Sequence, residues 1–84
     1  MNRVQTFPTH DIYQTAFLEL SGFPSTLLME TQQVVFNFEL SVQLVHAIAA
    51  YNAGMPVSAK AFARVIKLLK SRVEAIKREY EGSI

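Results

Sequence analysis

The chain has 84 residues, a formal net charge of +1 and no cysteine. This length suits a single domain, 1–84, and the lack of thiols excludes a disulfide framework and a thiolate metal site. Half of the residues are hydrophobic and only 18% are charged, which is more apolar material than so short a chain buries easily. The composition therefore predicts either an apolar surface or a core that a second copy completes.

The first residues, 1–6, are polar and lack the apolar stretch of a signal peptide. The longest uncharged run, 40–59, is interrupted by Gly54 and Pro56, so its helical part is too short to cross a bilayer. We therefore expect a cytoplasmic protein with no membrane partner.

Residues 1–8 are expected to form an extended arm. A first helix follows, capped by Thr9 or Asp11, because either side chain offers an oxygen to the free amides of a first turn. Gly22 is placed to end this helix as a left-handed residue. The apolar residues of the helix recur at spacings that put them on one face; they are Ile12, Tyr13, Ala16, Phe17 and Leu20.

Two strands are expected at 25–30 and 34–39. The second alternates Val34, Phe36 and Phe38 with Val35 and Asn37, which is the period of a half-buried strand. We expect the two to pair as an antiparallel hairpin, although the residues between them lack the Asn-Gly or Asp-Gly signal of a tight turn. Because a lone two-stranded ribbon is marginal in water, it is expected to pack on helices or to extend across a dimer.

A second helix is expected over 40–53, where most residues are apolar and none is formally charged. A helix that is apolar nearly all round lies in an interior. That interior is either the space between the hairpin and the third helix or the contact with a second copy, which the small alanines would let approach closely. We favour the dimer, and the candidate interface residues are Val42, Val45, Ala49 and Leu68.

The third and longest helix is expected over 59–80, with Ser58 as its cap. Residues 81–84 are expected to fray. The core stripe repeats at helical spacing and consists of Phe62, Val65, Ile66, Leu69, Val73, Ile76 and Tyr80.

Charge is divided unevenly along the chain. Residues 1–59 carry one basic side chain and four acidic ones, whereas 60–84 carry seven basic and three acidic. The basic face of the third helix is a candidate nucleic-acid contact, formed by Lys60, Arg64, Lys67, Lys70 and Arg78. Glu74 lies within this face and no aromatic residue accompanies it, so a solvated helix face, or charge complementary to another helix or subunit, is the favoured interpretation.

Residues with catalytic or metal-binding chemistry are scattered. Neither His10 nor His46 belongs to a metal-ligand motif; we expect His10 to be solvated and His46 to be a core or interface histidine. The sequence contains no serine-nucleophile motif and no glycine-rich phosphate loop. We therefore expect no catalytic residue, no cofactor and no metal, and hence no enzyme.

Two stretches carry a family resemblance. A Thr9 and Asp11 helix start closed by Gly22 precedes the strand 35–39, and Tyr51-Asn52-Ala53-Gly54 precedes the last helix. This order resembles a family of short bacterial and phage domains of unknown function, whose members run helix, hairpin, helix, helix. The resemblance implies the fold and no activity, and this chain departs from the family in lacking a glycine at the hairpin turn.

These patterns together predict an α+β fold with the order α-β-β-α-α, in which a two-stranded antiparallel hairpin packs on helices in two layers. The expected function is that of a non-enzymatic interaction module, homodimeric through the apolar helix 40–53. The alternative is a regulatory nucleic-acid-binding protein of phage or mobile-element type.

Overall fold

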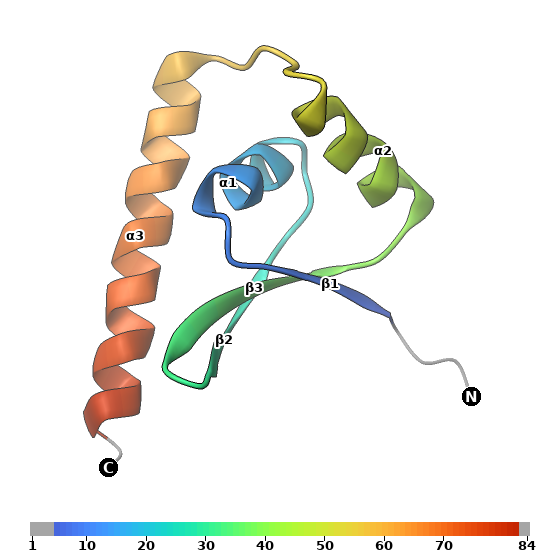
Figure 1. Ribbon diagram of the computed structural model, residues 1–84. Helices are drawn as coiled ribbons and strands as arrows, with labels where there is room; N and C mark the ends of the chain where they lie inside the picture. Colours follow the sequence, from blue (N-terminus) through green and yellow to red (C-terminus); the bar gives the residue numbers. More distant parts are fainter. Residues whose placement is uncertain (1–4, 83–84) are drawn as a thin grey trace.

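The computed structural model describes residues 5–82 and confirms the α+β class, but the sheet has three strands where two were expected (Figure 1). The observed order is β-α-β-β-α-α. The elements are β1 (Thr6–Thr9), α1 (Ile12–Leu20), β2 (Thr26–Glu30), β3 (Gln33–Glu39), α2 (Val42–Asn52) and α3 (Ala59–Gly82).

Strand β1 includes residues 6–8 of the extended arm expected over 1–8; residues 1–4 of that arm lie outside the described part. It pairs antiparallel with β3 and extends the sheet to the order β1-β3-β2. The Leu40 N–H donates to the Gln5 carbonyl at 2.8 Å. Hydrogen-bonded and non-hydrogen-bonded residue pairs alternate along β1 and β3 from this pair. Pro8 therefore falls opposite Asn37 at a pair that exchanges no hydrogen bonds, where its missing N–H would point away from β3.

The antiparallel hairpin of β2 and β3 is confirmed, and Glu30 pairs with Gln33 across a two-residue turn. Both turn residues have left-handed backbone, with φ of 48° at Thr31 and 67° at Gln32. This is the type I′ geometry that asparagine and glycine usually supply. The turn forms here without them, because the register of the buried strands dictates its length.

Helix α1 connects β1 to β2, the two outer strands of the sheet, and so crosses the central strand β3 (Figure 1). Both expected capping residues take part. Asp11 accepts from the N–H groups of Tyr13 and Gln14 at 2.9 and 3.2 Å, and the Thr9 hydroxyl accepts from the Asp11 N–H. Gly22 follows the helix with φ +99°, as expected.

The core lies around α1. Phe36 and Phe38 of β3 are buried in the same cluster as Ala16, Phe17 and Leu18 of α1. The face predicted for α1 is only partly right, because Tyr13 and Leu20 are exposed whereas Thr15 to Leu18 are all buried. A helix buried over four successive positions is covered on nearly all sides, which a single-stripe pattern does not predict.

Helix α3 begins after Ser58, whose hydroxyl accepts from the Ala61 N–H at 3.3 Å. Leu69 at the centre of the expected stripe is buried, and most of the other stripe residues are half-buried. Tyr80 at the end of the stripe is exposed. Residues 81–82, expected to fray, are helical, and 83–84 lie outside the described part.

Candidate interaction surfaces

Helix α2 is not enclosed between the hairpin and α3, which was one of the two interiors expected for it. It packs on α1, which separates it from α3 (Figure 1). Leu44 is its one fully buried residue. On the outer side, Val42 is 68% exposed and Val45 is 51% exposed, and Ala49 is exposed as well.

The inner side of α2 is held by specific contacts. The Tyr51 ring lies 5.4 Å from the Phe17 ring, centroid to centroid, and its hydroxyl donates to Asp11 Oδ2 at 3.5 Å. Burial, with the nearby Asp11 carboxylate, raises the pKa of Tyr51. The Ser41 hydroxyl caps the helix by accepting from the Leu44 N–H at 3.0 Å. Because these contacts fix the orientation of α2, its outer residues are held in place as a defined surface.

The three α2 candidates share one side of the helix, since positions 42, 45 and 49 recur at helical spacing. We call Val42, Val45 and Ala49 the α2 face. The fourth candidate, Leu68, is 59% exposed but belongs to α3, on the other side of α1. The structure therefore assembles three of the four predicted interface residues into one surface and places Leu68 elsewhere.

The loop between α2 and α3 adds exposed apolar residues that were not among the candidates. Met55 and Val57 are both exposed there. They lie in the same uncharged run, 40–59, that marked the helix, so the length of that run was the available signal.

The two histidines are both exposed, and they differ in how this compares with expectation. His46 is exposed on the outer side of α2, so it is not a core histidine, and the interface position expected as the other possibility stays a prediction. His10 is also exposed, as expected, and its Nδ1 lies 3.2 Å from the Val34 carbonyl. Because the Val34 carbonyl can only accept, His10 Nδ1–H is the donor. This hydrogen bond is made to a part of β3 that does not pair with β1.

The molecule is expanded for its size. Its radius of gyration is 13.8 Å, compared with about 12 Å for a compact chain of this length. Its accessible surface is 6161 Å², compared with roughly 5,000 Å² for a compact monomer of this mass.

The basic face of α3 has the exposure that a polyanion contact needs. The five candidate residues, Lys60, Arg64, Lys67, Lys70 and Arg78, are all exposed. No acidic residue precedes Glu74 in the helix, so the amino-terminal half of α3 carries uninterrupted positive charge. The carboxyl-terminal half mixes both signs, because Glu74, Glu79 and Glu81 lie among its bases.

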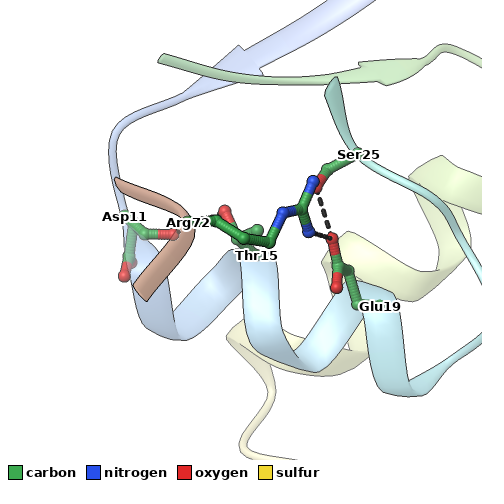
Figure 2. A network of polar contacts seen from close by, with 5 residues as sticks. All are labelled: Asp11, Thr15, Glu19, Ser25 and Arg72. Atoms are coloured by element: carbon green, nitrogen blue, oxygen red, sulfur yellow. Dashed lines mark hydrogen bonds and ion pairs between the residues drawn. The ribbon is translucent and has the colours of Figure 1, made fainter. Parts of the chain in front are cut away.

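A polar network joins α1, α3 and the start of β2 (Figure 2). Arg72 pairs with Glu19 Oε2 at 3.3 Å, and the Ser25 hydroxyl donates to the same oxygen. Thr15, which is buried, donates to the Asp11 carbonyl at 2.9 Å. The Arg72–Glu19 pair thus links α3 to α1, whereas the Thr15 hydrogen bond lies within the first turn of α1.

Within residues 5–82, no three His, Asp or Glu side chains gather in a way that would hold a metal ion. The helices of the same region are too short or too polar to span a membrane.

Comparison of the chain with family models, with curated proteins and with solved structures gives no match. The resemblance to short bacterial and phage domains therefore stays a prediction.

Proposed function

We propose that the protein is a small, non-enzymatic interaction module that forms a homodimer through the α2 face. The observation that carries this proposal is the α2 face, which lies on an uncharged helix and on which Val42 is 68% exposed and Val45 is 51% exposed. The chain as a whole exposes about 1,100 Å² more than a compact monomer of its mass.

The chemistry of α2 favours a second copy over a different partner. The helix and the loop after it carry no formal charge over residues 40–59, so they offer nothing that would select a charged partner. An apolar surface centred on small side chains can pack against its own copy about a two-fold axis. Ala49 and Ala53 leave room for that close approach.

The exposure of apolar side chains on α2 supports the same assignment. An exposed pair such as Val42 and Val45 is unfavourable in water, and burying each side chain would contribute about 1 kcal/mol. Met55 and Val57 beside the helix enlarge the apolar area that a second copy would cover.

Light scattering after size-exclusion chromatography tests the dimer. The expected mass is about 19 kDa, twice the 9.5 kDa of the chain. Val45→Glu should give a folded monomer, because it places a carboxylate in the centre of the contact. Leu28→Glu, at an exposed apolar position on the sheet, is the matched control and should stay dimeric.

Leu68→Glu extends the same experiment to the candidate on α3. A dimer in this variant limits the interface to α2 and its loop, and a monomer brings α3 into it. A wild-type chain that remains monomeric up to high micromolar concentration would contradict the proposal.

A second candidate function is nucleic-acid binding through the amino-terminal half of α3. It is favoured by the four exposed bases in that half of the helix, which are Lys60, Arg64, Lys67 and Lys70. Titration with random duplex DNA should then show affinity that falls steeply with salt, since phosphate contacts release counterions. The double variant Arg64→Glu with Lys67→Glu should lose that binding. Binding that is insensitive to salt and to both changes would exclude this surface.

A further inference from the structure

His46 has a position that the fold does not explain. It lies on the outer side of α2 with Val42 and Ala49, at spacings of four and three residues. Tyr51, on the inner side of the same helix, makes the contacts that hold α2 to α1. His46 makes no such contact and is the one outward residue of this stretch that can gain a charge near neutral pH.

The geometry points to an acid-sensitive assembly, in which protonation of His46 separates the two copies; this inference rests on the proposed homodimer. The outward residues of α2 run from Val42 to Ala53, and His46 lies near their middle. In any two-fold pairing centred on this surface, parallel or antiparallel, a residue near the middle comes close to its own symmetry mate. Two His46 side chains would then meet near the axis.

The surroundings of His46 leave a new positive charge without a counterion. Helix α2 itself carries no formal charge. The element packed on it is α1, whose acidic side chain Glu19 pairs with Arg72 and whose capping residue Asp11 contacts Tyr51 on the opposite side of α2. Glu39 lies outside the helix, three residues before its first residue, Val42. The facing surface of the second copy presents the same uncharged residues and another His46.

The direction of the pH effect follows from where the proton is bound more tightly. A protonated imidazole is well solvated in the separated chains and is desolvated beside a like charge in the dimer. Protons therefore bind preferentially to the monomer, and the dimer weakens as the pH falls. Two unit charges about 7 Å apart near a protein surface should weaken association by roughly 50-fold.

Sedimentation equilibrium at pH 8.0 and pH 5.0, at constant ionic strength, measures this effect. Wild type should be dimeric at the higher pH and dissociate at the lower one, with unchanged helical circular dichroism. His46→Gln keeps a polar side chain without the charge, and it should remain dimeric at both values. His10→Gln, which changes the histidine on the sheet, is the matched control and should dissociate in acid as wild type does.

Each other outcome is decisive. A wild-type dimer that persists at pH 5.0 overturns the inference and leaves the proposed homodimer intact. Acid dissociation that also occurs in His46→Gln overturns it, because another group is then responsible, and so does loss of helix before dissociation. A monomer at pH 8.0 removes the proposed function itself.

Discussion

Helices α1 and α2 are both short and mainly apolar, yet the chain treats them in opposite ways. Helix α1 contains Glu19 and three hydroxyl or amide side chains, and it buries four successive residues. Helix α2 has no formal charge and buries one. The difference follows from connectivity. Helix α1 joins the two outer strands and must cross the middle of the sheet, whereas α2 leaves the central strand β3 and packs at the margin of the helix layer.

Apolar content therefore indicates how much cover a helix needs, and the topology decides whether its own chain supplies that cover. Helix α1 receives its cover from the sheet and from both other helices. Helix α2 receives cover on one side only, and the remaining side is where a second copy is proposed to bind.

Truncation of one apolar residue in each helix, buried in α1 and exposed in α2, gives the largest contrast. Leu18→Ala in α1 should lower the free energy of unfolding by about 3 kcal/mol, because it removes a side chain that is completely buried. Val45→Ala in α2 should cost less than about 0.5 kcal/mol in the monomer. Urea denaturation at low protein concentration measures both values.

Repeating the Val45→Ala measurement at high concentration sharpens the comparison. A loss that grows with concentration is expected if the side chain is buried between copies. Equal costs for Leu18→Ala and Val45→Ala at low concentration would break the contrast between the two helices.

The caps of the two helices should differ by a smaller amount. Asp11→Ala should cost about 1.5 kcal/mol, because Asp11 accepts from two backbone N–H groups. Ser41→Ala, which removes a single acceptor at the start of α2, should cost about 1 kcal/mol. Thermal and urea denaturation report these losses, and Asp11→Asn is the control that should retain most of the stability. A larger loss from Ser41→Ala would mean that α2 contributes more to the monomer than its burial indicates.

The smallest effect is expected at the hairpin turn, which lies outside both helices. Thr31→Asn with Gln32→Gly should raise the free energy of unfolding by about 1 kcal/mol, because both positions have positive φ. The urea midpoint should rise while the difference between Leu18→Ala and Val45→Ala stays the same. A decrease in stability would show that Thr31 and Gln32 make favourable contacts that outweigh their backbone strain.

Local signals in the sequence predicted the local structure well. Asp11 and Ser58 lie next to helix starts and accept backbone N–H groups there, and Gly22 and Gly54 follow helix ends with positive φ. Ser41, which was expected inside the helix 40–53, is instead the residue that caps it. The alternation of Val34, Phe36 and Phe38 marked one side of β3, and this side does pack in the core, but the expected half-buried strand is only partly right because Val35 on the other side is buried as well. Each of these features depends on residues a few positions apart.

Features that depend on distant residues were missed. Strand β1 is short and contains Pro8, and its pairing partner is some thirty residues away, so no local period marked it. The exposure of His46 depends on which side of α2 meets α1, and an almost uniformly apolar helix gives no stripe from which to predict that side. The grouping of Val42, Val45 and Ala49 without Leu68 likewise depends on the position of α1 between α2 and α3.

Pro8 also limits how a further strand can add to the sheet beside β1. The outer edge of β1 lacks one backbone donor, because the Pro8 nitrogen carries no hydrogen at the position where a neighbouring strand would accept one. Amyloid-like stacking or strand exchange at this border is thereby discouraged, even though the segment is extended and short of charge. At this edge, contacts between copies are therefore expected to use side-chain packing and not backbone hydrogen bonds.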